Sequence, residues 1–203
     1  MTTKQILLSI FILGATASNT LAMNQEAKIK QQEMNKELLD AAHIGKLKKA
    51  TRLLNAGANV NAKNEYHKGT ALHNAAAMLL TNMFKVKDEN RIAIAEMLIK
   101  NGADINAQNK YGYTPAHCAA YRCDRSMLEL LAKNGADFNL ENKDGDTPFM
   151  TITKEKSFWD NNNWKNDNCQ DAYNFLLNIE TIIRNRNSER FANLIGSLNH
   201  EQQ

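Results

Sequence analysis

The sequence has few cysteines, no block of basic residues and, beyond its first two dozen positions, no long run of apolar residues. Its 203 residues carry 25 Lys and Arg against 22 Asp and Glu, a formal net charge of +3. Because nucleic-acid binders usually concentrate basic residues in a patch, this near balance argues against a nucleic-acid partner. Beyond residue 22, no segment has the length or apolarity of a membrane-spanning helix.

The 3 cysteines do not have the spacing of a disulfide framework or of a zinc site. Cys118 and Cys123 lie five residues apart, Cys169 is distant in the sequence, and no C-x-x-C pair occurs. At most one disulfide can form, so one thiol stays free, and the sequence leaves the pairing open. We expect no metal and no cofactor, and we interpret Cys118 as a small buried hydrophobe.

The first residues differ in character from the rest of the chain. Lys4 precedes an apolar run, Ile6–Ala17, and small residues follow at 15–17 and 20–22. This order is typical of a secretory signal peptide, and about a dozen apolar residues are too few to span a bilayer comfortably. We therefore expect residues 1–22 to be a signal peptide, cleaved after Ala17 or Ala22, and the product to be exported, either secreted or periplasmic. A buried N-terminal helix or a short membrane anchor is the alternative.

Internal repeats dominate the rest of the sequence. Three copies of one segment are LLNAGANVNAKN (53–64), LIKNGADINAQN (98–109) and LAKNGADFNLEN (131–142). A second copied segment reads GTALHNAA (69–76), GYTPAHCAA (112–120) and GDTPFMTI (145–152). The interval from Thr114 to Thr147 is 33 residues, and that from Thr70 to Thr114 is 44.

A period of 33 residues with these two segments resembles the ankyrin-repeat family over about residues 35–152. The resemblance implies an all-α solenoid of about four helix-turn-helix units with β-hairpin-like connections. The expected organisation after the signal peptide is a polar linker or frayed helix (23–34), a capping repeat (35–64), a repeat with an insertion between its helices (65–109), a regular repeat (110–142) and a degenerate repeat with a helical cap (143–203).

The regular repeat shows how one unit folds. Thr114 can cap a helix that begins with Pro115 and runs over Ala116–Tyr121. Apolar residues at helical spacing predict a second helix over Ser126–Asn134, which Gly135 ends in a left-handed conformation. One such unit buries only one side of its apolar layer, so neighbouring units must stack.

His73 and His117 match the histidine of the family's T-P-L-H element. The resemblance implies that each histidine hydrogen-bonds to the backbone and ties the hairpin to its helices. A thiol enzyme or a metal site around His117, Cys118 and Asp124 is the alternative, but it would need side chains that reach a substrate. We therefore expect no catalytic residues.

Several segments depart from the family pattern. About eleven extra residues around Met78–Glu89 form either a loop at the edge or a longer first helix. Cys123 replaces the usual glycine of the inter-helix turn, which we expect to be slightly strained, and Arg125 replaces an apolar residue. We expect Ser157–Asn168 to be an Asn-rich loop in which Trp159 and Trp164 pack an irregular cap.

Helical periodicity resumes over Gln170–Ile183, and a separate amphipathic segment is expected over Ser188–Leu198.

In the family, hairpin tips and outward residues of the first helices form a concave face that binds proteins. The positions chosen as the protein-binding site are Tyr66, His67, Lys110, Tyr111, Tyr113, Tyr121, Arg122, Asp144 and Asp146, with Glu65, Lys68, Ala77, Lys143 and Thr153 on the same face. Tyr and Arg are enriched at interface hot spots.

These observations predict a monomeric, non-catalytic protein that binds another protein through this face. Lysine, asparagine and isoleucine usage together with the first residues suggests a bacterial exported protein, such as a secreted effector. A periplasmic scaffold or an immunity-like protein that shields its partner is the alternative. A hydrolase that uses Cys118 and His117, or a purely structural spacer, are the competing classes. The repeats do not name the partner, because fold alone does not fix function.

Overall fold

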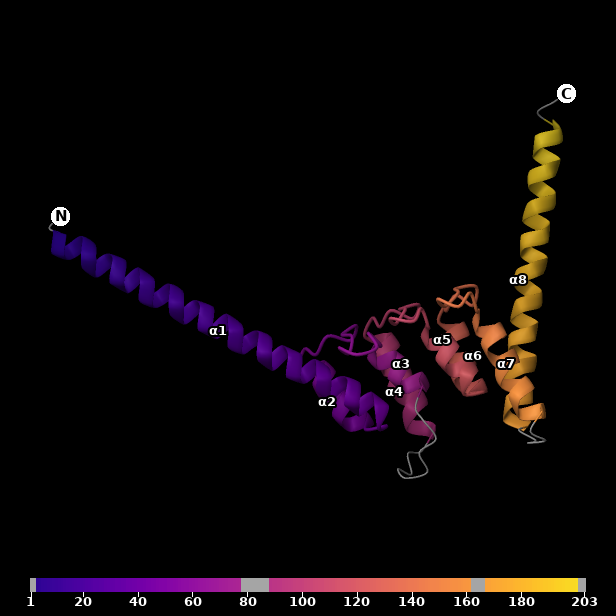
Figure 1. The fold of residues 1–203 in the computed structure, drawn as a ribbon, viewed down its shortest axis with the longest axis horizontal. Helices are drawn as coiled ribbons and strands as arrows, with labels where there is room; N and C mark the ends of the chain where they lie inside the picture. The colour runs from indigo at the N-terminus through magenta and orange to yellow at the C-terminus, as the bar shows by residue number, and fades with distance from the viewer. Residues whose placement is uncertain (1–2, 78–87, 162–166, 201–203) are drawn as a thin grey trace.

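The computed structural model describes residues 3–77, 88–161 and 167–200, which contain eight helices and, within these ranges, no β-strand. The helices are α1 (Thr3–His43), α2 (Leu47–Asn55), α3 (Ala71–Ala77), α4 (Asp88–Lys100), α5 (Pro115–Tyr121), α6 (Arg125–Lys133), α7 (Pro148–Asn161) and α8 (Asp167–His200). Consecutive helices pair, and the pairs stack in chain order (Figure 1). This arrangement confirms the predicted α-solenoid.

The stack has two layers of helices. The first helices of the pairs contact one another along one layer, from α1 through α3 and α5 to α7, and the second helices do so along the other. Alanines fill the tight contacts of the first layer, and leucines fill the space between layers. The fully buried members include Ala75, Ala76, Ala119, Ala120, Leu72, Leu98, Leu128 and Leu131. Small side chains let neighbouring helices approach closely, as the repeat pattern requires.

The regular repeat begins and ends as its sequence predicts. The Thr114 side chain accepts a hydrogen bond from the His117 backbone N–H, and Pro115 is the first residue of α5. Asp124 caps α6 in the same way by accepting from Met127 N–H at 3.0 Å. Gly135, just beyond α6, has φ +86°, a left-handed conformation that glycine adopts without steric cost.

The N-terminal helix is longer than the sequence suggested. Residues 23–34, expected as a polar linker or a frayed helix, are helical and continue without a break into the first helix of the capping repeat. The Gln31 amide donates to the Gly57 carbonyl at 3.0 Å, and the Asn35 side chain accepts from Asn59 N–H at 2.8 Å. Contacts with the loop after α2 therefore hold this polar segment in place. No helix of the described ranges carries a stretch long and apolar enough to cross a membrane.

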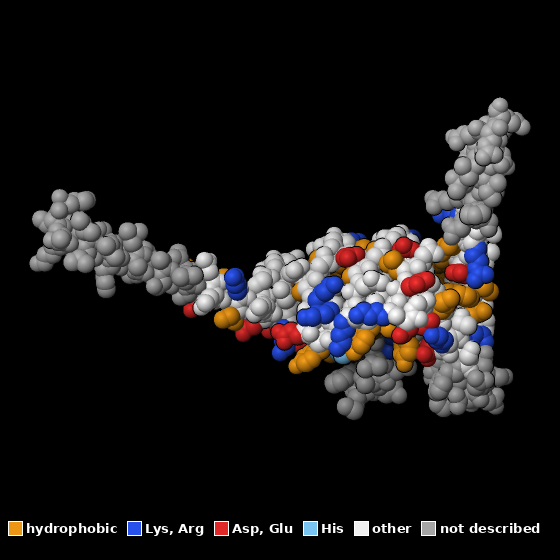
Figure 2. Space-filling model, turned by 45° about the horizontal axis from the view of Figure 1, so that its top comes forward, with side chains coloured by type: hydrophobic (Ala, Val, Ile, Leu, Met, Phe, Trp, Pro, Cys, Tyr) orange, Lys and Arg blue, Asp and Glu red, His pale blue; other side chains and the backbone are white. Residues whose placement is uncertain are grey.

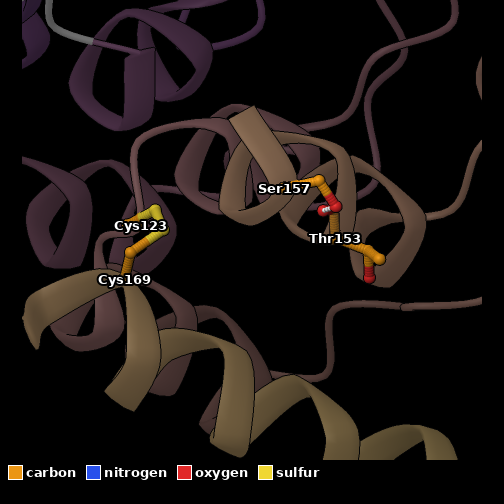
Figure 3. Close-up of a disulfide and its surroundings, with 4 residues drawn as sticks. All are labelled: Cys123, Thr153, Ser157 and Cys169. Atoms are coloured by element: carbon orange, nitrogen blue, oxygen red, sulfur yellow. Dashed lines mark hydrogen bonds between the residues drawn. A yellow bond between two sulfur atoms is a disulfide. The ribbon is translucent and has the colours of Figure 1, made fainter. Parts of the chain in front are cut away.

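The C-terminal region differs most from its prediction. The Asn-rich loop expected over Ser157–Asn168 is wrong at both ends, because α7 continues to Asn161 and α8 begins at Asp167. The Ser157 hydroxyl donates to the Thr153 carbonyl at 2.9 Å, so a polar side chain is satisfied within the helix and does not end it (Figure 3). The segments expected separately over 170–183 and 188–198 lie on α8 alone.

Two predictions fall on residues outside this description. The insertion between α3 and α4 largely coincides with residues 78–87, so its two alternatives stay untested. Trp164 and the side chain of Trp159 are likewise outside the described residues, as is the role assigned to them in the C-terminal cap.

A disulfide joins the third helix pair to the fourth. Cys123, in the turn between α5 and α6, pairs with Cys169 in the first turn of α8, with Cα atoms 4.5 Å apart (Figure 3). Both cysteines are buried, and Cys118 keeps the free thiol. Arg125 adds to this contact, because its guanidinium lies 4.4 Å from the ring centre of Phe175 on α8. The unusual residues at 123 and 125 therefore attach the C-terminal helix.

Candidate protein-binding surface

Three hairpin-shaped loops connect the helix pairs and lie along one edge of the stack (Figure 1). In each loop, an asparagine N–H donates to a carbonyl on the returning segment. These bonds are Asn64 to Gly69 at 2.9 Å, Asn109 to Tyr113 at 3.0 Å and Asn142 to Asp146 at 2.9 Å. The same contact therefore closes every tip, which confirms the expected hairpin-like connections.

The hairpins also bond to one another. Lys110 N–H in the second hairpin donates to the His67 carbonyl of the first at 2.8 Å, and Lys143 N–H in the third donates to the Tyr111 carbonyl at 2.9 Å. Gly112 makes the second contact possible, because a Cβ at this residue would lie 2.8 Å from Lys143 N. The three tips consequently form one continuous hydrogen-bonded ladder.

His73 and His117 tie this ladder to the helices. Nδ1 of His73 accepts from Thr70 N–H at 3.2 Å and from the Thr70 hydroxyl at 2.9 Å, while Nε2 donates to the Tyr113 carbonyl of the next hairpin at 2.9 Å. His117 repeats this pattern with Thr114 at 3.2 and 2.8 Å and with the next hairpin's Asp146 carbonyl at 2.8 Å. The predicted structural role of both histidines is confirmed.

Burial keeps both imidazoles neutral. Burial lowers the pKa of His73 to about 4, although the hydrogen bond to Tyr113 opposes the shift. Burial also lowers the pKa of His117. A proton added to Nδ1 would point at the threonine N–H, which is itself a donor, so the charged form would lose this bond and would have only the threonine hydroxyl as an acceptor there.

The residues weighed for thiol catalysis have other partners. Cys118, expected to be buried, is only half-buried against the core. The apolar surroundings of its thiol still raise its pKa to about 12, so the thiolate that catalysis requires is scarce at neutral pH. Both ring nitrogens of His117 are engaged as described above. The Asp124 carboxylate pairs with the buried Arg91, whose Nε donates to the Ala75 carbonyl at 3.2 Å. In the part of the chain that the structure describes, no three His, Cys, Asp or Glu residues form a group that could hold a metal ion.

Part of the predicted binding set comes together at the hairpin tips. The rings of His67 and Tyr111 have centres 5.8 Å apart, and the Lys110 ammonium lies 4.9 Å from the Tyr111 ring centre. Tyr111 is 48% exposed even though it has these neighbours. A tyrosine held by neighbouring rings and charges loses little side-chain entropy when a partner covers it, which favours it as a binding residue.

The remaining predicted residues have mixed environments. Tyr66 is 79% exposed on the first tip, and Tyr121 is 56% exposed at the far end of α5, away from the tips. Tyr113 packs edge-on against His117, with ring centres 5.5 Å apart, and Arg122 is half-buried. Asp144 is exposed. The Asp146 carboxylate pairs with Lys154 at 2.5 Å, so this residue also stabilises the fourth helix pair.

A groove of 710 Å³ lies between α1 and the first hairpin. Tyr66 and His67 line it on the hairpin side, and Ile29, Lys36 and neighbouring residues of α1 line it on the other. Sequence analysis missed the α1 wall because residues 23–34 were read as polar. The spacing of Met34 and Leu38, four residues apart and both turned toward the core, is the signal that α1 packs there.

The charge of the hairpins changes along the array. The first tip, residues 61–69, has Lys63 and Lys68 against Glu65. The third tip, residues 137–146, has one lysine against four carboxylates, namely Lys143 against Asp137, Glu141, Asp144 and Asp146. Figure 2 shows Lys and Arg mixed with Asp and Glu over the central repeats, without one large patch of single sign. A partner that covers all three tips would meet opposite charges at its two ends.

Comparisons with known proteins agree with this fold. A family model described as ankyrin repeats in many copies matches residues 83–132. A Fowlpox virus (strain NVSL) protein whose name describes it as an ankyrin repeat protein is 34% identical over 79 residues, which is 39% of this chain and 11% of the viral one. The match shows ankyrin repeats over residues 83–132, and the helix pairs on either side continue the same fold. Ankyrin repeats generally serve as protein-interaction modules. The chain spans only a small part of this relative.

Proposed function

We propose that this protein binds a partner protein, without catalysis, through its hairpin tips and the exposed ends of its first helices. The observation that carries the proposal is the cluster of His67, Lys110 and Tyr111, in which an exposed tyrosine is positioned by two neighbours on a hydrogen-bonded ladder. Tyr66, on the first tip, and Tyr121, at the far end of α5, are also exposed and belong to the proposed surface. Exposed tyrosines on a rigid scaffold are characteristic of binding surfaces.

We further propose that it acts outside the cytoplasm as an exported, bacterial protein. The signal-like first residues motivate this proposal, and the buried Cys123–Cys169 disulfide supports it, because structural disulfides persist mainly in oxidising compartments. A secreted effector is the use we favour, and a periplasmic scaffold or immunity-like protein that shields its partner is the second. Recovery of the partner from a host extract, as opposed to the producing cell, would decide between them.

The binding proposal is tested with a triple variant of the exposed tyrosines, Tyr66→Ala, Tyr111→Ala and Tyr121→Ala. Tyr113 is left in place because it packs on His117. We expect the affinity for a captured partner to fall by tenfold or more, while the melting temperature stays within a few degrees of that of the unaltered protein.

The matched control removes two exposed apolar side chains from α8, with Leu177→Ala and Ile182→Ala, which lie away from the hairpins. This control should keep the full affinity. Equal binding by the tyrosine variant and the control would contradict the proposed surface and favour a structural spacer.

A further inference from the structure

The hairpin ladder has an open edge at its first hairpin. In the second and third hairpins the residue just before the tip, Lys110 or Lys143, donates its N–H to the preceding hairpin. Tyr66 holds the equivalent place, immediately before His67, but no hairpin precedes it. Among the described residues, neither Tyr66 N–H nor the adjacent Glu65 N–H meets an acceptor.

A second row of contacts ends at the same place. The Gln108 carbonyl accepts from the Lys63 ammonium at 3.2 Å, and the Glu141 carbonyl accepts from the Gln108 amide at 2.9 Å. In the first hairpin, Lys63 holds the place that Gln108 and Glu141 hold in the second and third. Within the described ranges no donor reaches its carbonyl. The first hairpin therefore presents one unused acceptor, the Lys63 carbonyl, and two unused donors, the N–H groups of Glu65 and Tyr66, on the side that faces α1.

Helix α1 takes the place of a preceding repeat in packing against the helices, but it supplies no hairpin beside the first tip. Between repeats, an asparagine side chain accepts from the N–H of the next Gly-Ala-Asp turn, as in Asn61 with Asp104 at 2.7 Å and Asn106 with Asp137 at 2.8 Å. Asn35, on α1, makes the corresponding contact with Asn59 at 2.8 Å. Because α1 continues as a helix and does not form a hairpin, the place beside the tip is left open.

That open place is the 710 Å³ groove described above. Its apolar surface comes from Ile29, 55% exposed, and from Tyr66. Its charged residues nearly balance, with Glu33, Asp40 and Glu65 against Lys36 and Lys63. The net charge of the groove therefore favours neither a charged nor a neutral partner. The unused backbone groups and the apolar surface suit an extended polypeptide, whose backbone can pair with them while alternate side chains face the groove.

We propose that an extended segment of the partner protein occupies this groove and continues the ladder by one strand. One carbonyl of the segment accepts from Tyr66 N–H, a donor of the segment binds the Lys63 carbonyl, and an apolar side chain packs between Ile29 and Tyr66. Strand addition of this kind takes its affinity from main-chain hydrogen bonds and its specificity from alternate side chains. The inference rests on the proposed protein-binding function and adds the form in which the partner is recognised.

The test uses linear peptides as the probe. A library of random twelve-residue peptides is selected against the full chain, and the tightest synthetic peptide is added to isotope-labelled protein for amide hydrogen exchange. We expect exchange at Tyr66 N–H to slow at least tenfold on binding. Tyr66→Pro, which removes this N–H, should bind at least tenfold more weakly than Tyr66→Ala, which keeps it, and Glu65→Ala should bind as the unaltered protein does.

Selected peptides that slow no amide within residues 65–67, or equal binding by the proline and alanine variants, would overturn the strand-addition proposal. The exchange measurement needs no variant, so it decides the matter even if Tyr66→Pro folds poorly. Peptides weakened only by Tyr111→Ala or Tyr121→Ala would overturn this proposal and leave the tip surface standing. A slowed Tyr66 amide together with unchanged peptide binding by a Tyr111→Ala, Tyr121→Ala double variant would support strand addition and contradict the wider tip surface.

Discussion

At the scale of single residues, the two buried histidines show how one side chain connects three parts of a repeat. Each uses Nδ1 for the threonine at the start of its own helix and Nε2 for the next hairpin. Each is nearly inaccessible to solvent, so both hydrogen bonds replace contacts with water. Protonation of Nδ1 would set it against the threonine N–H, which is itself a donor, and burial disfavours the charged ring, so we expect the stack to be sensitive to acid.

Lowering the pH from 7 to 5 should destabilise the protein. The pKa of His73 falls from its ordinary value of 6.5 to about 4 in the fold, so between these values the unfolded chain binds more protons. The stability from a neutral His73 is complete above pH 6.5 and is lost as the pH falls toward 4, with about 2 kcal/mol lost by pH 5. Urea unfolding at both pH values measures this loss, and His73→Gln, which cannot titrate, should reduce it. An unchanged pH dependence in this variant would show that other groups are responsible.

The residue Cys123 is held in a conformation that suits glycine. Its φ is +55°, and a non-glycine residue in this region costs about 1 kcal/mol. We expect Cys123→Gly to be more stable than Cys123→Ser by about that amount, because both variants lack the disulfide and only glycine relieves the backbone. Thermal or urea unfolding of the two variants measures the difference. Equal stabilities would mean that the turn relaxes when the disulfide is absent.

At the scale of elements, the hairpins depend on close contact between neighbouring backbones. The second and third tips meet where Gly112 faces Asn142 and Lys143. Nothing lies within 4 Å of the corresponding Cβ position of Gly145, which is at the open end of the ladder. Both glycines have positive φ, at +82° and +77°, so they differ in the space around them and not in backbone conformation.

This pair of glycines gives a matched test of the ladder. Gly112→Ala should lower the free energy of unfolding by about 1–3 kcal/mol more than Gly145→Ala, since only the first places a Cβ against backbone atoms, at 2.8 and 2.9 Å. Urea unfolding measures both, and amide exchange at Lys143 should rise in the first variant alone. A similar loss in both variants would indicate that conformation alone sets the cost.

At the scale of the whole molecule, stability comes from contacts between neighbouring helix pairs. Each pair buries its apolar face only against the next, so the two ends need special arrangements. At the N-terminal end, α1 supplies Asn35 in place of a preceding repeat. At the C-terminal end, α8 contacts α6 and α7 and is linked covalently through Cys169.

Reduction of the disulfide should therefore destabilise the array, beginning at its C-terminal end. The bridge joins residues separated by 46 positions, for which loop-closure entropy predicts a contribution of about 4 kcal/mol or less. We expect a lower melting temperature in reductant, with amide protection lost first on α8. A double variant, Cys123→Ser with Cys169→Ser, should give the same melting temperature with and without reductant. If reductant did not change the melting temperature of the parent protein either, packing alone would hold α8.

The repeat architecture could be predicted in detail because its determinants are local. Thr114, Pro115 and Gly135 act within one unit, and the period of 33 residues repeats the same local choices. The exposure of the residues chosen for the proposed binding face was predicted only in part, because exposure depends on neighbours. Tyr111 and Tyr66 are exposed as expected, whereas Tyr113 is turned against His117 by its place beside the next repeat. The predicted end of the first helix in the fourth unit was wrong because Ser157, which reads as a loop residue, donates to the Thr153 carbonyl within α7 and does not end the helix.

The sequence by itself determined the repeating helix pairs, the hairpin tips and the two histidines that join them, because each depends on residues close together in the chain. Only the tertiary structure decided which cysteine stays free, since Cys123 and Cys169 meet through the packing of α8 on α6. It also decided that α1 forms one wall of a groove beside an unpaired hairpin edge. Contacts between distant segments depend on how whole layers stack, and no local pattern of residues specifies which distant segments meet.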